Sequence, residues 1–225
     1  MASTAPFAVP ALGLYGRVVI VLLPPSEGKA TGGRGEWDPS SGTFGAQLGE
    51  RRAAIARTLF GDGAVPGLPA WRRYTGVVWK HLDPATLTTG QRRRIVVPSG
   101  LMGLARADDP VPDHRLKMAA SAWRPAVTDA LVAHGRGPVV DLLPNEHANA
   151  IDWKMLALHR RVVRVDFAYT DSGTAAGHDA KAVKGIVART VVQHGLAALA
   201  AFEWEGWTSS KTKGGFTITR PNRAR

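Results

Sequence analysis

Residues 17–29 read "RVVIVLLPPSEGK", an apolar and largely β-branched run that ends in two prolines and a polar turn. β-Branched residues favour strands, and a short continuous apolar run is typical of a strand buried on both faces. We therefore predict a buried strand over 17–23. The turn that follows it carries Ser26, Glu27 and Lys29. Ligand sites of open α/β sheets gather at the carboxyl ends of strands, so this turn is either a plain connection or the rim of a site.

The same pattern recurs along the chain. Strands are predicted over 93–100, 137–144 and 160–169, and helices over 44–60, 115–134 and 178–200. A late strand is expected over 214–221, paired with "AFEWEGWTSS" (201–210) as an antiparallel edge. Buried strands that alternate with helices predict an α/β fold, here a single compact domain over 17–225. Residues 1–16 are expected to be a disordered extension rather than a signal peptide.

The composition favours a protein that binds anions. The 225 residues include 29 Lys and Arg against 18 Asp and Glu, a formal net charge of +11, and no cysteine. The absence of cysteine excludes disulfides, thiolate metal sites and a cysteine nucleophile, and it fits a cytoplasmic location. No stretch approaches the roughly 18 apolar residues of a membrane span. We expect a soluble monomer with a polyanion as partner. The alternative is that many arginines are simply solvated: Arg51, Arg52, Arg72, Arg73, Arg92, Arg93, Arg94, Arg160 and Arg161.

The segment 97–118 is the second site-like stretch. Ser99, Gly100 and Gly103 follow a predicted strand, and small residues there allow the backbone to approach a ligand closely. Titratable side chains then concentrate at Asp113, His114, Arg115 and Lys117. A solvated loop is the alternative interpretation.

The predicted helix over 178–200 has a cationic face. Its apolar residues recur at helical spacing, whereas His178, Lys181 and Arg189 lie on the opposite side with Lys184 flanking them. The nearest acid is Asp179 at its start, so the helix lacks the acidic partners of an ordinary exposed helix. This face predicts contact with an anionic partner, and we expect Lys181, Lys184 and Arg189 to be exposed.

The segment 141–153, "DLLPNEHANAIDW", contains Glu146 and His147 but no spacing typical of a metal site. Neither Ser26 nor Ser99 lies in a nucleophile elbow, so a Ser–His–Asp triad is not supported. No metal is expected, and the sequence identifies no cofactor.

Together these stretches resemble the YaaA family of bacterial peroxide-stress-resistance proteins. The matching blocks are "PPSEGK" (24–29), "SGLMG" (99–103) with "HRLKM" (114–118), the segment 141–153, the residues Lys181, Lys184, Gly185 and Arg189, and the closing "GWTSSKTKGGFTITR" (206–220). The chain departs from the pattern at Met102, where an aromatic residue is usual, and at 144–147.

The resemblance implies a mixed central sheet flanked by helices, called the cantaloupe fold, with a positively charged cleft. It also implies DNA binding through a helix–hairpin–helix-like element and a cytoplasmic role against oxidative damage. The anion-binding residues expected from these stretches and from the cationic helix face are Ser26, Lys29, Ser99, Gly100, Gly103, Arg115, His178, Lys181, Lys184 and Arg189.

Two functions stay open on the sequence. One is a DNA-binding or other polyanion-binding protein of the peroxide stress response. The other is a diverged enzyme that acts on a small anionic or nucleotide-like substrate in a specialised pathway, with Glu27 as acid or base and Lys29 beside it as catalytic candidates. In either case we predict that Glu27, Lys29, Arg115 and Lys181 gather around one concave pocket.

Overall fold

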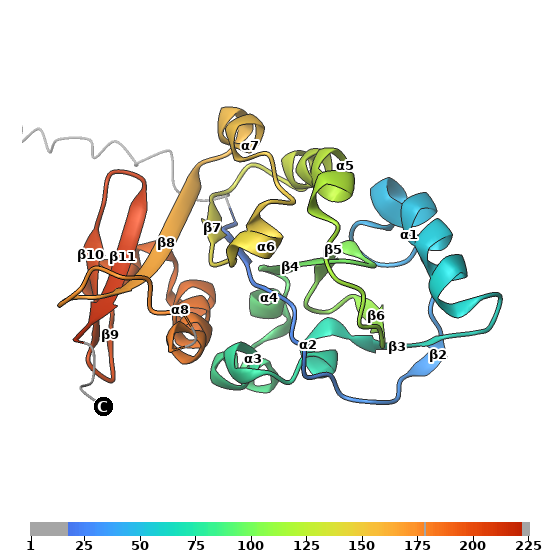
Figure 1. Ribbon diagram of the computed structural model, residues 1–225, viewed down its shortest axis with the longest axis horizontal. Coiled ribbons are helices and arrows are strands. Elements are labelled where there is room, and N and C mark those ends of the chain that lie inside the picture. The colour runs from blue at the N-terminus through green and yellow to red at the C-terminus, as the bar shows by residue number, and fades with distance from the viewer. Residues whose placement is uncertain (1–17, 178, 222–225) are drawn as a thin grey trace, which may run out of the picture.

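The computed structural model describes residues 18–177 and 179–221; the expected extension 1–16 and His178 lie outside them. An eight-stranded mixed sheet with the order β5-β4-β1-β7-β8-β11-β10-β9 runs through the molecule (Figure 1). Its strands are β1 (Ile20–Leu22), β4 (Ile95–Ser99), β5 (Gly103–Arg106), β7 (Val139–Asp141), β8 (Val162–Tyr169), β9 (Glu203–Trp204), β10 (Trp207–Lys211) and β11 (Gly215–Arg220).

Strand β1 lies in the parallel part of this sheet, between β4 and β7. Val21 aligns with Ile95 on one side and with Val140 on the other. Neighbouring residues of β1 point to opposite faces: Val21 packs into one apolar cluster and Leu22 into the other. The apolar run therefore reflects burial on both faces, and the turns after β1, β4 and β7 leave the sheet at the same edge.

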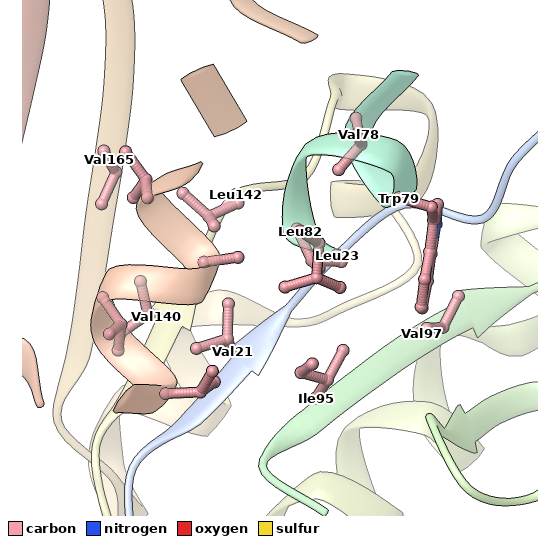
Figure 2. Close-up of a cluster of buried hydrophobic side chains, with 14 of the residues drawn as sticks. Val21, Leu23, Val78, Trp79, Leu82, Ile95, Val97, Val140, Leu142 and Val165 are labelled. Atoms are coloured by element: carbon pink, nitrogen blue, oxygen red, sulfur yellow. The ribbon is translucent and has the colours of Figure 1, made fainter. Parts of the chain in front are cut away.

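Helices cover both faces of the sheet around β1, β4 and β7. On one face, α3 (Val77–Leu82) and α8 (Ala180–His194) pack against the parallel strands, and Figure 2 shows Val78, Trp79 and Leu82 of α3 over the side chains of β1 and β4. On the other face lie α1 (Gly45–Phe60), α5 (Ala120–Ala133) and α7 (Trp153–His159). The short helices are α2 (Ala70–Arg73), α4 (Thr89–Arg92) and α6 (Asn145–Ala148), with 3-10 turns η1 (Pro84–Thr86) and η2 (Leu196–Ala201).

The predicted α/β fold with a mixed central sheet is confirmed, as is the antiparallel pairing of β10 with β11. Two helix boundaries differ. The helix expected over 115–134 begins only at Ala120, and the helix expected over 178–200 ends at His194, because Gly195 has φ +84° and a 3-10 turn follows. No helix among the described residues is long and apolar enough to cross a membrane.

A second, three-stranded antiparallel sheet was not predicted. It consists of β2 (Arg34–Glu36), β3 (Pro66–Pro69) and β6 (Pro110–Pro112) in the order β2-β3-β6. Prolines at the ends of β3 and β6 make these short stretches look like loops in the sequence.

The idea that the arginines are merely solvated is wrong for three of them. Arg52 and Arg73 are fully buried and Arg160 nearly so. Each donates hydrogen bonds to backbone carbonyls, as Arg160 does to Gly137 and Leu131 at 2.8 and 3.0 Å. Part of the positive charge therefore belongs to the interior.

Candidate functional site

The turn after β1 is fixed to the segment between α2 and α3. Lys29 forms a backbone bridge with Tyr74, and the Thr75 amide donates to the Gly28 carbonyl at 3.0 Å. The Ser26 hydroxyl accepts a hydrogen bond from the Gly76 amide, at 2.7 Å, directly before α3 begins. Ser26, predicted as an anion-binding residue, therefore has a structural hydrogen bond that sets the path of this turn.

Arg73 holds the chain beyond Lys29. Its guanidinium donates to the carbonyls of Ala30, Gly32 and Val111, the last from Nε at 3.1 Å. Because Val111 belongs to β6, this buried cation links the turn after β1 to the small sheet. The position of Lys29 is thus fixed by the hydrogen bonds of Arg73 as well as by its own loop.

The Lys29 ammonium lies among like charges. Its Nζ is 5.9 Å from the centroid of the Tyr74 ring. Burial lowers the pKa of Lys29, and Arg115 and Arg73 lower it further, whereas Asp113 and Glu27 act in the opposite direction. Arg115 itself is exposed and pairs with Asp113, with Nη1 2.5 Å from Oδ1.

His114 and Ser99 form a buried pair beside these charges. The His114 Nε2 atom is 3.2 Å from the Ser99 Oγ, and the Leu116 amide donates to His114 Nδ1, also at 3.2 Å. An Nδ1 atom that accepts a hydrogen bond carries no proton, so the proton is on Nε2, which donates to Ser99. Burial, with Lys29 nearby, lowers the pKa of His114 to about 4, and the ring is neutral at pH 7.

Tyr74 completes this group, which we call the Lys29 cluster: Lys29, Tyr74, Ser99, His114 and Arg115. Tyr74 is 2% exposed, and its ring packs against Trp79 with centroids 5.1 Å apart. Its hydroxyl lies next to the Ser99 side chain but makes no hydrogen bond of normal geometry with any described residue. Burial raises the pKa of Tyr74, so the phenol keeps its proton.

Comparison with known proteins identifies the family of this chain. The family model described as "Peroxide stress protein YaaA" matches residues 45–213, three quarters of the chain. The chain belongs to the YaaA family.

Relatives from several bacterial groups agree with this membership. A UPF0246 protein of Streptomyces coelicolor is 32% identical, over 80% of this chain and 85% of the relative. One of Corynebacterium efficiens is 28% identical, over 50% and 62% of the two chains. A third, from Shewanella oneidensis, is 28% identical over 72% of this chain and 68% of its own length.

A second group of charged side chains surrounds Lys184 of α8, one of the residues that resemble the YaaA family. Lys184 is half-buried, with its Nζ 5.3 Å from the Phe167 ring centroid. Burial lowers its pKa, while Asp141 at the end of β7 raises it. Burial in turn raises the pKa of Asp141, whose Oδ2 is 3.4 Å from Nη1 of Arg164.

Only part of the cationic face predicted for α8 is exposed. Arg189 donates to the carbonyls of Leu82 and Asp83 at 2.9 and 3.1 Å, so it holds the end of α3. Lys181 is exposed, and its charge acts on Lys184. We expected all three cations to be exposed. This expectation is wrong for Arg189, and Lys184 is only partly exposed.

The glycines of the "SGLMG" block approach the chain itself. A Cβ on Gly100 would lie 2.4 Å from the Lys117 carbonyl oxygen. A Cβ on Gly103, which has φ +62°, would lie 2.5 Å from the Trp123 ring. Both positions are thus explained by packing.

Four residues were predicted to converge. The charges of Glu27 and Arg115 both act on the pKa of Lys29, so these three lie near one another. Lys181 acts on the α8 group instead. A cavity of about 640 Å³ lies elsewhere, between α1 and the 116–123 segment, with mainly apolar walls that include Ile55, Leu59 and Trp123. Tyr74 and Arg73 were missed because the short segment that carries them follows no predicted strand.

Proposed function

We propose that this YaaA-family protein acts in the peroxide stress response and binds the phosphate groups of DNA through the Lys29 cluster. The observation that carries the proposal is the gathering of cations there: burial lowers the pKa of Lys29 most, and Arg115 and Arg73 lower it further. A bound phosphate relieves the repulsion between these cations, whereas the protein alone offers only Asp113 and Glu27. The exposed Lys181 on α8 supplies a further phosphate contact.

The test is a titration of fluorescent duplex DNA at several salt concentrations with the double variant Lys29→Gln/Arg115→Gln. We expect at least about tenfold weaker binding and a salt slope reduced by about 2, since each neutralised phosphate contributes about 0.9. Lys154→Gln, an exposed lysine of α7 on the other face of the sheet, is the matched control for the loss of a charge. A double variant that behaves like Lys154→Gln rules out DNA binding through this cluster.

A second function is favoured by the titration behaviour of the cluster. A neutral buried His114, a protonated Tyr74 and a Lys29 of lowered pKa lie together, and such groupings occur at active sites. The corresponding proposal is an enzyme for a small anionic or nucleotide-like substrate, with Glu27 as acid or base. Phosphorus NMR of nucleotides incubated with the protein tests it. Glu27→Gln should abolish turnover and leave DNA affinity unchanged, and loss of DNA binding with no turnover in the native protein favours the first proposal.

A further inference from the structure

We infer that the Tyr74 hydroxyl is a hydrogen-bond donor to a ligand, and that the ligand group it meets is a phosphate monoester or inorganic phosphate rather than an internal DNA phosphodiester. This inference deepens the DNA proposal, on which it rests for the anionic nature of the ligand.

The first step is the orphan hydroxyl. The Tyr74 side chain is 2% exposed, and its hydroxyl has no hydrogen-bond partner of normal geometry among the described residues. A buried hydroxyl without a partner costs about 1–3 kcal/mol, so a folded protein that retains one gains something from it elsewhere.

The second step is the direction of the neighbouring protons. His114 Nε2–H donates to Ser99 Oγ because the Leu116 amide occupies Nδ1. The Ser99 hydroxyl therefore keeps its own proton to donate, and the Tyr74 hydroxyl lies next to it. In this order of donors, from His114 to Ser99 to Tyr74, the proton of Tyr74 has no acceptor among the residues that the structure describes. The order also excludes His114 as a base for Ser99, since its Nε2 lone pair is absent.

The third step is charge. The Lys29 ammonium lies over the ring that carries this hydroxyl, and Arg115 and Arg73 act on Lys29. A donor hydroxyl beside an ammonium and a guanidinium matches an oxyanion with several free oxygens, because such a group accepts bonds from all of them.

The fourth step is depth. A phosphodiester within a duplex is bonded on two sides and lies on the surface of a wide rod, so it fits beside a buried hydroxyl less well than a small terminal phosphate does. A phosphate with three free oxygens is small and ends the molecule that carries it. Inorganic phosphate, a nucleoside monophosphate and a 5′-phosphorylated DNA end share this chemistry.

The test is Tyr74→Phe, which keeps the ring under Lys29 and removes only the oxygen. We expect inorganic phosphate, followed by calorimetry, to bind about tenfold more weakly, the effect of one hydrogen bond to a charged group. Urea unfolding should show nearly unchanged stability, because no described residue accepts the proton of the hydroxyl. Unchanged phosphate binding, or lower stability with unchanged binding, overturns the inference and gives the hydroxyl a structural role.

Two further arms identify the source of the phosphate and guard against a damaged fold. The first arm compares the binding of duplexes that end in a 5′-phosphate with that of duplexes that end in a 5′-hydroxyl. If the protein prefers the phosphorylated end and Tyr74→Phe removes that preference, the ligand is a DNA end. If the protein binds phosphate without that preference, the ligand is a free nucleotide or inorganic phosphate. Ser99→Ala should weaken phosphate binding less than Tyr74→Phe does. If Lys29→Gln/Arg115→Gln abolishes DNA binding while Tyr74→Phe changes nothing, the inference fails and the DNA proposal stands.

Discussion

Arg52 is a buried cation that backbone carbonyls neutralise. Its guanidinium donates to Met102 and Leu104 at 2.9 and 2.8 Å, and to Pro39 and Ser41 at 3.1 and 2.9 Å. Burial lowers its pKa to about 10, which leaves it charged at pH 7. One side chain of α1 thereby satisfies four carbonyls from two separate segments.

We expect Arg52→Met to destabilise the protein by at least about 3 kcal/mol, because it leaves several buried acceptors without donors. Arg57→Met is the matched control: this arginine is exposed on the same helix, and its loss should cost less than about 1 kcal/mol. Urea unfolding of both variants measures the difference. Equal losses would mean that the carbonyls find other donors.

His114 should make stability depend on pH. Its pKa is about 4 in the folded protein, below the usual 6.5, so the unfolded chain binds more protons between these values. Stability contributed by the neutral ring is present above pH 6.5 and is lost as the pH falls toward 4, by about 3 kcal/mol at most. The charged neighbours are Lys29, Arg73, Asp113 and Arg115.

The measurement is the free energy of unfolding at pH 7 and pH 4.5 for the native protein and for His114→Gln. Burial also lowers the pKa of His134 and His147, so both proteins should lose stability on acidification. The native protein should lose more, and the difference belongs to His114. Parallel pH profiles would show that this ring titrates normally.

At the scale of elements, the contact between α8 and α3 depends on Gly185. A Cβ there would lie 2.3 Å from the Val78 carbonyl oxygen and 2.8 Å from the Leu82 nitrogen. We expect Gly185→Ala to destabilise the protein by about 2 kcal/mol or more, although alanine is the better helix former by about 1 kcal/mol.

The same substitution at Gly90 in α4 is its control, since among the described residues outside its own helix backbone only the Thr88 hydroxyl, at 3.9 Å, lies near a Cβ there. Gly90→Ala should leave stability unchanged or raise it by up to about 1 kcal/mol. Thermal unfolding of the two variants should therefore move in opposite directions, and a common direction would contradict the packing argument.

The elements that the sequence predicted well are those whose signal is local. The apolar runs of β1, β4 and β7 mark strands because burial on both faces leaves little room for polar residues, and β8 is marked by the alternation of buried and exposed residues. The start of α5 could not be predicted: residues 116–117 look helical, but their carbonyls lie against Gly100. For the candidate site, Lys29 and Arg115 were selected because they follow strands, and their role stays a prediction. Tyr74 joins them only through a backbone bridge that no local pattern reveals.

At the scale of the whole molecule, the formal charge of +11 overstates the positive charge that the surface presents. Arg52, Arg73 and Arg160 are buried, and Arg189 is 3.7 Å from an Asp83 carboxylate oxygen. We expect Lys181→Ala to reduce the salt slope of DNA binding by about 1 without changing stability. Arg189→Ala should instead lower stability by about 1–3 kcal/mol. Anisotropy titrations and urea unfolding separate the two, and equal salt slopes would show that α8 does not contact DNA.

The ends of the large sheet determine how the molecule behaves at high concentration. At one end, the outward groups of β5 are already used: the Leu104 carbonyl accepts from Arg52, and the Arg106 amide donates to Asp109 at 2.8 Å. At the other end, β9 is two residues long and begins with Glu203. A strand from another copy would therefore meet bonded groups on β5 and only a short strand at β9, and we expect little edge-to-edge growth of the sheet.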